Sequence, residues 1–267
     1  MMSGIGVERR GGLLEITIDR PKVNAIDRAT SRLMGEAFVA LRDDPDLRVA
    51  ILTASGDRLF SAGWDLKALE SGDQQLDNWW ETEDATLGGF AGITEMWNLD
   101  KPVIAALNGH AIGGGFEIAL ACDLVIAADH VEFALPELPL GIVPDAGALQ
   151  RLPRRLPTNV AMEMLLLGRR MKAAEARRLG LVNAVVPAAQ LMAKARHWGE
   201  RLAAGAPLAL GAVKEVLRAI EGETVEGAFR TMRSADLPLY RRMLASDDAR
   251  EGISAFVERR QPVFLGR

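Results

Sequence analysis

Two glutamates lie in local sequences that favour chemistry over solvation. Glu117 follows the glycine run Gly113–Gly115 at the start of a helical stretch. Glu137 stands between Pro136 and Pro139, which restrict the backbone to a rigid turn. Two carboxyl groups that converge in one site can have their pKa values driven apart, giving one acid and one base at neutral pH. The alternatives are a first-turn acid favoured by the helix dipole and an ordinary loop charge.

The glycine run also marks a turn from a strand to a helix, between Val103–Leu107 and Ile118–Ala121. Glycines let the backbone approach a ligand closely, and the N–H groups at a helix start can hold a negatively charged oxygen. A second turn of this kind, Phe60–Lys67, follows the β-branched run Val49–Thr53. Two such N–H donors on one carbonyl oxygen would form an oxyanion hole. Alternatively, the glycines serve packing, and Asp65 caps an ordinary helix.

Composition and charge limit the class of protein. The 267 residues are 49% hydrophobic and 25% charged, with a net charge of −4, which argues against a surface built for nucleic acid or anionic membrane. No signal peptide and no run of eighteen apolar residues is visible. Cys122 is the only cysteine, so neither an intramolecular disulfide nor a cysteine zinc site can form. We therefore expect a cytoplasmic protein without nucleic-acid or membrane partners.

The elements that would position these turns follow an alternating α/β pattern. A helix is predicted over Ala29–Leu41, and the chain from Thr158 onward is mostly helical. The alternation of strands and helices favours crossover units and a mainly parallel sheet. We predict an α/β core over residues 1–200 and a helical region over residues 201–267. The predicted strands are Leu13–Asp19, Val49–Thr53, Val103–Leu107, Leu124–Ala127 and Val182–Val186.

Taken together, the motifs resemble the crotonase superfamily, also called the enoyl-CoA hydratase/isomerase family, over almost the whole chain. The resemblance implies an α/β fold, a spiral of ββα units with a helical C-terminal trimerisation region, and a homo-oligomer, either a trimer or a dimer of trimers. In this sequence Ala148 and Leu149 replace a glycine-containing pair usual in the family, a departure expected to affect the surroundings of Glu137. The stretches that carry the resemblance are Asp19–Ile26, Ser61–Leu66, Lys101–Ala106, Gly113–Glu117, Phe133–Glu137 and Gly141–Gly147.

The resemblance also implies a reaction, the reversible hydration of a 2-enoyl-CoA by a hydro-lyase. The peptide N–H groups of Trp64 and Gly114 would hold the thioester oxygen. Glu117 would activate the water at C3, and Glu137 would deliver a proton to C2. The implied chemistry uses no metal, nicotinamide or flavin, because coenzyme A is part of the substrate.

Further contacts to coenzyme A are implied by the same resemblance. Tyr240 occupies an aromatic position near the adenine, and Arg259 stands where a lysine contacts CoA, often from the neighbouring subunit. The basic run Arg151–Arg178 is either a second attraction for the CoA phosphates or a solvated helical face, of which we favour the second. The other expected substrate contacts are Lys22, Ala25, Ala62, Asp65, Leu66 and Lys67.

The acyl group is expected to be cationic. The segments Gly63–Ala68, Gly89–Glu95 and Asn98–Pro102 are most similar to family members that act on crotonobetainyl-CoA, whose acyl group ends in trimethylammonium. Tryptophan faces are good partners for such a group, although indoles also serve as core or interface residues. We expect at least one of three tryptophans to face the acyl tail, namely Trp79, Trp80 and Trp97.

Two other functions remain open, a general enoyl-CoA hydratase or isomerase and a non-catalytic RNA-binding member of the fold. The net charge and the presence of both glutamates weigh against RNA binding. The sequence leaves open the physiological direction and the exact oligomer. Four polar residues near the motifs are expected to act as caps or structural hydrogen-bond partners, namely Asp65, His110, Asp123 and Asp145.

Overall fold

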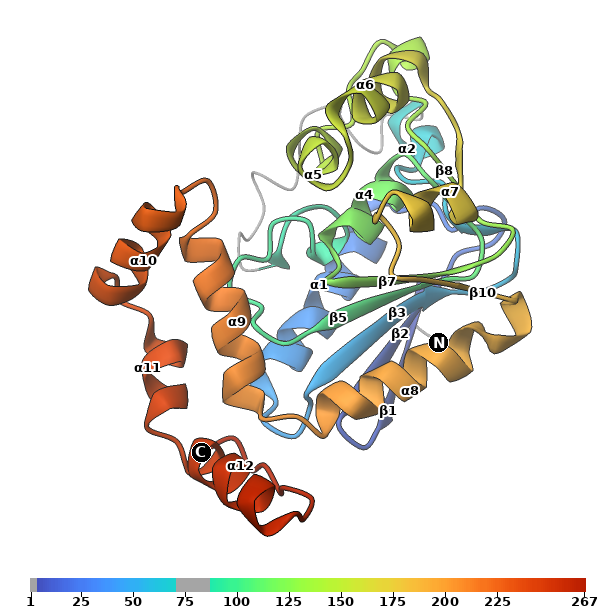
Figure 1. Cartoon of the computed structure of the whole chain (residues 1–267). Helices are drawn as coiled ribbons and strands as arrows, with labels where there is room; N and C mark the ends of the chain where they lie inside the picture. The colour runs from blue at the N-terminus through green and yellow to red at the C-terminus, as the bar shows by residue number, and fades with distance from the viewer. Residues whose placement is uncertain (1–3, 71–86) are drawn as a thin grey trace.

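The computed structural model describes residues 4–70 and 87–267, which form two sheets and the helices around them (Figure 1). The larger sheet has the order β1-β2-β3-β5-β7-β10, and only the β1–β2 pair is antiparallel. Its strands are β1 (Gly4–Arg10), β2 (Leu13–Asp19), β3 (Val49–Ala54), β5 (Val103–Leu107), β7 (Leu124–Ala128) and β10 (Ala184–Val186).

The smaller sheet has the order β4-β6-β8-β9, and β4, β6 and β8 are parallel. Each of these strands directly follows a strand of the larger sheet, so the chain repeats a turn of two strands and a helical segment. This repetition is the spiral of ββα units that the resemblance implies. The strands are β4 (Leu59–Ser61), β6 (His110–Ile112), β8 (Glu132–Ala134) and β9 (Met171–Lys172).

The spiral explains where a site can form. Parallel neighbours end at one edge of their sheet, and ligands of open α/β sheets bind beyond that edge. After β4 the chain reaches Trp64, after β6 it reaches Gly114, and after β8 it reaches Glu137. Three segments far apart in the sequence are therefore brought to the same edge.

Helices cover both faces of the larger sheet. Successive side chains of a strand point to opposite faces, so Ile51 packs on the side of α8 while Leu52 packs toward α1 and the smaller sheet. Burial on both faces explains why these strands are continuous apolar runs. The helical segments around the sheets are α1 (Arg28–Asp43), α2 (Leu66–Glu70), η2 (Phe90–Gly92), α4 (Gly114–Ala121), η3 (Leu138–Leu140), α5 (Ala148–Arg155), α6 (Thr158–Leu167), α7 (Ala173–Arg178), η4 (Ala188–Gln190) and α8 (Leu191–Ala203).

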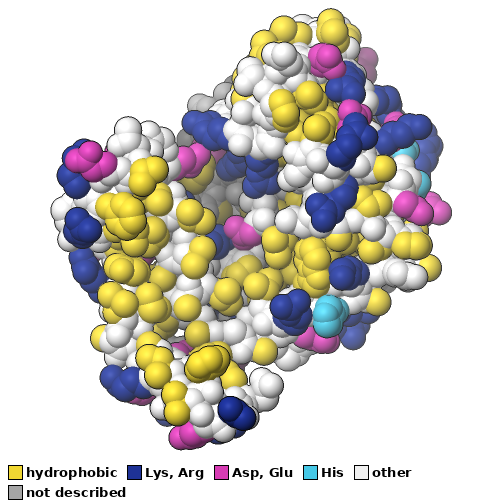
Figure 2. Space-filling model, in the orientation of Figure 1, with side chains coloured by type: hydrophobic (Ala, Val, Ile, Leu, Met, Phe, Trp, Pro, Cys, Tyr) yellow, Lys and Arg dark blue, Asp and Glu magenta, His cyan; other side chains and the backbone are white. Residues whose placement is uncertain are grey.

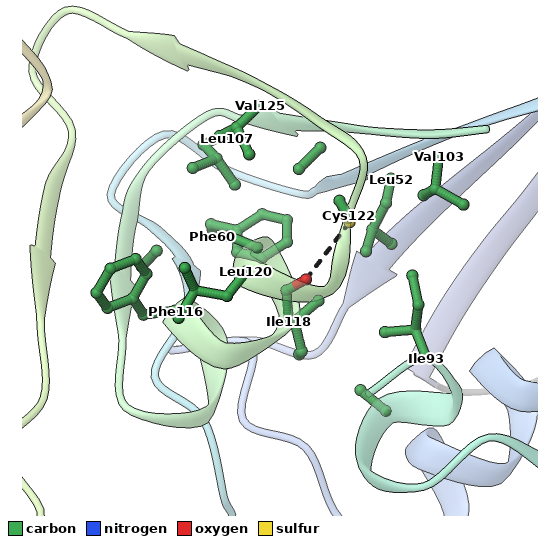
Figure 3. Close-up of a cluster of buried hydrophobic side chains, with 14 of the residues drawn as sticks. Leu52, Phe60, Ile93, Val103, Leu107, Phe116, Ile118, Leu120, Cys122 and Val125 are labelled. Atoms are coloured by element: carbon green, nitrogen blue, oxygen red, sulfur yellow. Dashed lines mark hydrogen bonds between the residues drawn. The ribbon is translucent and has the colours of Figure 1, made fainter. Parts of the chain in front are cut away.

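The core beneath α4 is built from aromatic and aliphatic side chains (Figure 3). Phe116 and Phe133 have ring centroids 5.0 Å apart, and Phe60 is fully buried nearby. Cys122 lies in the same cluster, where its thiol donates to the carbonyl of Ile118 at 3.4 Å. Burial raises the pKa of this thiol to about 12. The single cysteine is therefore a packing residue.

The C-terminal helices extend from the core as an arm (Figure 1). The predicted boundary at residue 200 falls inside α8, which packs on β3, β5 and β7, so the division into core and helical region stays a prediction. In residues 4–70 and 87–267, no helix combines the length and apolar character needed to cross a membrane. The arm consists of α9 (Pro207–Ala219), α10 (Val225–Ser234), α11 (Pro238–Leu244) and α12 (Asp247–Glu258).

An ion pair fastens α8 to the larger sheet. Glu15 on β2 is 5% exposed, and its carboxylate accepts two N–H groups from Arg196 at 2.7 and 2.8 Å. Arg10 approaches the same carboxylate at 3.2 Å. The hydrogen bonds from Arg196 hold the pKa of Glu15 below its ordinary value. A bidentate pair of this kind, with two parallel N–H···O bonds, is the strong form of a carboxylate–arginine contact.

We expect Arg196→Met to lower the free energy of unfolding by about 1–3 kcal/mol at pH 7, because it leaves a buried carboxylate with one weaker partner. Denaturant unfolding measures this loss. Because the pKa of Glu15 is lower in the folded state than in the unfolded state, its carboxylate stabilises the fold at pH values above the unfolded pKa. This stabilisation is lost as the pH falls through the folded pKa, so the difference in unfolding free energy between Arg196→Met and the parent should shrink below about pH 4. Arg32→Met, which breaks the exposed pair with Glu36, is the control and should cost only tenths of a kcal/mol. An equal effect in both variants would contradict this role of the pair.

Candidate active site

A cavity of about 260 Å³ lies beyond the ends of β4, β6 and β8. Prolines and aliphatic side chains of the segment 136–144 form much of its wall, and Asp145 completes it. Both glutamates and both proposed N–H donors reach the same space. The predicted site residues that line it are Ala62, Trp64, Leu66, Gly114, Glu117 and Glu137.

The first N–H turn is held by the segment that precedes α1. The N–H of Ile26 donates to the carbonyl of Gly63 at 2.7 Å, and the N–H of Asp65 donates back to the carbonyl of Ile26 at 3.0 Å. The Ser61 hydroxyl accepts the N–H of Gly63 and donates to the carbonyl of Asn24. These bonds fix the backbone on both sides of Trp64.

Arg20 stabilises the same turn from the outside. Its guanidinium lies 2.8 Å from Asp27 and 3.1 Å from Asp65, and it donates to the carbonyl of Ala25 at 2.6 Å. The Asp65 carboxylate also accepts the N–H of Lys67, so its expected role as a cap is confirmed. Ala25, Asp65 and Lys67 are thus brought beside the site without lining the cavity, and the exposed Lys22 does not line it either.

The glycines bring the two turns into contact backbone to backbone. A Cβ atom on Gly63 would lie 2.5 Å from the amide nitrogen of Gly114, and one on Gly115 would lie 2.2 Å from the carbonyl oxygen of Ser61. A Cβ atom on Gly114 would meet the Phe90 ring at 2.7 Å. Close packing therefore requires glycine here, and it also places the amides of Trp64 and Gly114 next to each other. Gly114 is the first residue of α4, where an N–H has no partner within the helix.

Glu117 lies in the first turn of α4 and is only 3% exposed. Its Oε1 accepts the N–H of Ala148, the first residue of α5, at 2.9 Å. Burial raises its pKa to about 8, the negative charges of Glu137 and Asp145 act in the same direction, and the bond from Ala148 opposes them. Ala148, one of the two residues that depart from the family's usual pair, thus bonds to Glu117 through its backbone N–H. The expected effect of the departure on the surroundings of Glu137 stays a prediction.

Glu137 lies after the end of β8 and is the N-cap residue directly before η3. Its backbone carbonyl accepts the N–H groups of Leu140 and Ile142, which fixes the turn predicted from the flanking prolines. Burial raises the pKa of its carboxyl to about 7, and the charge of Asp145 adds to the effect. Its Oε2 is buried and has no hydrogen-bond partner among the described residues. A Cβ atom on Gly113 would lie 2.6 Å from its Oε1, so the carboxyl lies against the start of α4.

This arrangement can stabilise an oxyanion and move protons beside it. Two carboxyl groups whose pKa values are raised to about 7 and 8 can share a proton near neutral pH, as an acid–base pair requires. Two backbone N–H groups at neighbouring turns are suited to a carbonyl oxygen that gains charge. The cavity thus suits proton transfer or water addition next to a carbonyl group.

Two residues near the cavity were not predicted to act there. Asp145 was expected to be a cap or structural partner, but it lines the cavity, and its charge reaches both glutamates. Arg151 was placed in a basic run on a solvated face, but it is partly buried and donates to the carbonyl of Thr94 at 2.5 Å. The sequence signal that could have identified Asp145 is that it is an acidic residue within the motif Gly141–Gly147. No local feature of the sequence distinguishes Arg151 from the basic residues that follow it.

The tryptophan expectation is not met by the described residues. Trp97 is 63% exposed, carries the guanidinium of Arg151 5.7 Å above its ring and does not line the cavity. Trp79 and Trp80 lie outside the described residues. Trp64 does line the cavity, as expected for a residue whose backbone N–H was predicted to contribute to the site.

Other predicted residues lie away from the cavity. Tyr240 is on α11 and Arg259 directly follows α12, both on the arm, so this chain alone does not bring them to the glutamates (Figure 1). His110 and Asp123 are structural, as expected. The His110 ring accepts the N–H of Glu132, and the Asp123 carboxylate accepts the N–H of Val103.

Comparison with known proteins gives a consistent result. The sequence profile described as enoyl-CoA hydratase/isomerase matches residues 8–267. The chain is 52% identical over 267 residues to a protein of Proteus mirabilis named carnitinyl-CoA dehydratase, and 53% identical over 269 residues to one of Escherichia coli K12 with the same name. Both alignments cover 100% of each chain.

Solved structures agree with the sequence comparisons. The crystal structure of an enoyl-CoA hydratase from Mycobacterium tuberculosis H37Rv superposes with a TM-score of 0.87 at 38% identity, covering 99% of both chains. One from Bacillus anthracis gives a TM-score of 0.88 at 31% identity, covering 99% of this chain and 100% of the other. The fold class expected from the sequence is confirmed. The chain belongs to the enoyl-CoA hydratase/isomerase family.

Proposed function

We propose that the protein catalyses the reversible hydration of a 2-enoyl-CoA, with crotonobetainyl-CoA and carnitinyl-CoA as the substrate pair. The observation that carries this proposal is the convergence of Glu117 and Glu137 in one cavity with two adjacent backbone N–H turns. Full-length relatives with 52% and 53% identity are named carnitinyl-CoA dehydratase, which supports the choice of acyl group.

In the proposed reaction the thioester oxygen accepts the N–H groups of Trp64 and Gly114. Glu117 takes a proton from water as the water oxygen bonds to C3, and electron density moves through C2 onto the thioester oxygen. Glu137 then gives its proton to C2 as the thioester carbonyl re-forms. Dehydration follows the same steps in reverse. Every proton that leaves one carboxyl group is matched by one accepted at the other.

These roles require the shared proton to reside on Glu137 when substrate is bound. Burial favours the proton on Glu117 instead, because it raises the pKa of Glu117 further than that of Glu137. The hydrogen bonds favour a proton on Glu137. Ala148 donates to Glu117 and stabilises its charge, whereas Glu137 has a bond from its own backbone N–H but none to Oε2 from the described part of the chain. We assign the proton by the hydrogen bonds, since a buried carboxylate oxygen without a partner is costly.

The proposed chemistry needs no metal, nicotinamide or flavin. The oxyanion is stabilised by N–H groups, water is activated by a carboxylate, and no hydride is transferred to or from C2 or C3. Coenzyme A enters as part of the substrate. The mildly acidic charge and the single buried cysteine support a cytoplasmic location without a nucleic-acid partner.

We further propose that the arm forms the subunit interface of a trimer or a dimer of trimers. Apolar side chains gather on the C-terminal helices in Figure 2, and large exposed apolar patches mark interaction surfaces. Assembly would bring Tyr240 and Arg259 to the CoA of a neighbouring subunit. The exposed apolar residues are Val213, Leu217, Val225, Phe229, Leu244, Ile253, Phe256 and Val257.

We expect Glu117→Gln and Glu137→Gln each to reduce the kcat for hydration by about 10²- to 10⁴-fold, the usual effect of removing a positioned acid or base. The loss of enoyl-thioester absorbance measures turnover, with a chelator present throughout. The Tm at pH 7 should not fall, because each change replaces a buried group that can carry a charge with a neutral side chain of the same shape.

Glu132→Gln is the matched control, since this acid on β8 pairs with Arg170 outside the cavity. Its kcat should stay within about twofold of the parent, as expected for a surface pair. Near-parental activity in Glu117→Gln or Glu137→Gln would remove that residue from the mechanism. A parent that mainly shifts 3-enoyl to 2-enoyl thioesters would be an isomerase.

The pH dependence of kcat/KM should be bell-shaped, because one carboxyl group must be charged and the other neutral. The raised pKa values of about 7 and 8 lie well above the ordinary pKa of glutamate. They place the rising and falling limbs of the pH profile on either side of pH 7.5. Activity should fall below about pH 6.5 as the base gains a proton, and above about pH 8.5 as the acid loses its own. A flat profile between pH 5 and 9 would contradict the shared-proton mechanism.

We expect Phe256→Glu, at a side chain 85% exposed, to reduce the oligomer to species near the 28.9 kDa of one chain. A charge in an apolar interface is left without a partner and opposes association. Light scattering after size-exclusion chromatography measures the mass. Val7→Glu, at a half-exposed side chain on β1, is the control and should keep the parental mass. A parent that is itself monomeric at micromolar concentration would refute the assembly.

A further inference from the structure

Arg151 folds back over the start of its own helix. Its backbone N–H donates to the carbonyl of Gly147 at 2.9 Å, and its guanidinium lies against the same residue, where it leaves no room for a Cβ atom. Gly147 has a φ of 133°, which favours glycine, and it directly precedes Ala148. Through both its backbone and its side chain, Arg151 thus holds the residue before Ala148, whose N–H donates to Glu117.

The far end of the Arg151 side chain reaches the segment after η2. The guanidinium donates to the carbonyl of Thr94 at 2.5 Å and lies 5.7 Å from the centroid of the Trp97 ring. Thr94 is 1% exposed, and its hydroxyl donates to the carbonyl of Phe90 at 3.1 Å. The Phe90 ring in turn packs against Gly114, where a Cβ atom would lie 2.7 Å from it. Arg151 therefore links the start of α5 to the start of α4.

Glu117 is subject to opposing influences, and Arg151 is one of them. Burial raises the pKa of Glu117 to about 8, and the negative charges of Glu137 and Asp145 act in the same direction. The N–H of Ala148 and the positive charge of Arg151 lower this pKa. Both of these groups belong to α5, so this helix favours the charged form of the carboxyl group.

The charge of Arg151 is itself influenced from three directions. Burial lowers the pKa of its guanidinium, and the neighbouring charge of Arg155 on α5 adds to this effect. Glu117 on α4, Cys122 directly after α4 and Glu95 after η2 act in the opposite direction. An arginine side chain stays protonated in proteins, so its positive charge acts on Glu117 throughout the pH range of the reaction.

We infer that Arg151 is a positioning residue for the proposed reaction, because it holds the start of α5 and its Ala148 donor against Glu117 and adds a positive charge that stabilises this carboxylate. The inference rests on the proposed role of Glu117 as the base. Arg151 does not line the cavity, so it acts through Glu117 and not on the substrate. A base must be charged to accept a proton from water, so the loss of Arg151 should matter most at acidic pH.

The test measures kcat/KM for the hydration of crotonobetainyl-CoA at pH 6 and pH 9, in the parent and in Arg151→Met. Without the arginine, Glu117 takes up a proton at higher pH, so fewer molecules hold a charged base at pH 6. At pH 9 the reaction is limited by the proton on Glu137 instead. We expect the ratio of the pH 6 value to the pH 9 value to fall about three- to tenfold. A fraction of inactive protein lowers both values equally and cancels in the ratio.

Three further variants separate the charge from the fold. Arg154→Met is the matched control, since it removes an exposed positive charge from the same helix, where Arg154 pairs with Glu221. Its ratio should equal that of the parent. Arg151→Lys keeps a positive charge and an N–H donor and should restore most of the parental ratio. Arg151→Gln keeps a donor for Thr94 without the charge and should lower the ratio, which gives a second test if Arg151→Met does not fold.

Three results would overturn the inference. The first is a parental ratio in both Arg151→Met and Arg151→Gln. The second is an equal loss of kcat/KM at pH 6 and pH 9, which would make Arg151 a purely structural residue. The third is an equal fall of the ratio in Arg154→Met, which would show that any positive charge on the helix has the same effect.

A direct titration distinguishes this inference from the function on which it rests. The infrared band of the protonated Glu117 carboxyl group, identified by its absence in Glu117→Gln, reports the charge of this residue without substrate. Its midpoint should move to higher pH in Arg151→Met and stay unchanged in Arg154→Met. A parent that hydrates no enoyl thioester but shows this shift would refute the proposed function and leave the effect of Arg151 on Glu117 standing. An active parent whose midpoint does not move in Arg151→Met would refute the inference alone.

Discussion

The site depends on the direct contact between two backbone turns. Gly63 meets the amide of Gly114, and Gly115 meets the carbonyl of Ser61, at distances that leave no room for a side chain. The first turn is held by hydrogen bonds to residues 24–26, and the second begins α4, so neither can shift without disturbing the core. Because a helix start has N–H groups without helical partners, the same contact that packs the spiral also places such N–H groups at the edge of the cavity, where we propose that they bind the thioester oxygen.

The glutamates acquire their chemistry from where the spiral places them. Burial disfavours the charged form of a carboxyl group, and both side chains are almost inaccessible to water. Glu117 lies between the starts of two helices, α4 and α5, which moderates the penalty of its charge. Glu137 lacks that support for one oxygen and is held by a turn that its flanking prolines make rigid. Two chemically identical residues thus differ in how readily each can hold a charge.

Sequence patterns predicted the long elements and the two glycine-containing turns that meet at the cavity, but not the small sheet. Leu13–Asp19 and Val103–Leu107 were found with the correct ends, because strands buried on both faces are continuous apolar runs. The strands β4, β6 and β8 have three residues each, too few to show a period. Glu117 and Glu137 carried local signals in their glycines and prolines. The cavity position of Asp145 depends on contacts across the fold, so it could not be read from local sequence. Tyr240 and Arg259 lie on the C-terminal arm, and their expected contacts with CoA stay a prediction.

One short stretch of chain serves two purposes. Residues 140–145 supply aliphatic and acidic side chains to the cavity wall, and three residues later Ala148 donates the hydrogen bond that lowers the pKa of Glu117. The loop and the helix start are continuous backbone, so a substitution that reshapes the wall also moves this donor. The shape of the cavity wall and the pKa of Glu117 are therefore linked. An engineer who retargets the enzyme through this loop will have to restore the Ala148 bond, and natural divergence at this loop is subject to the same coupling.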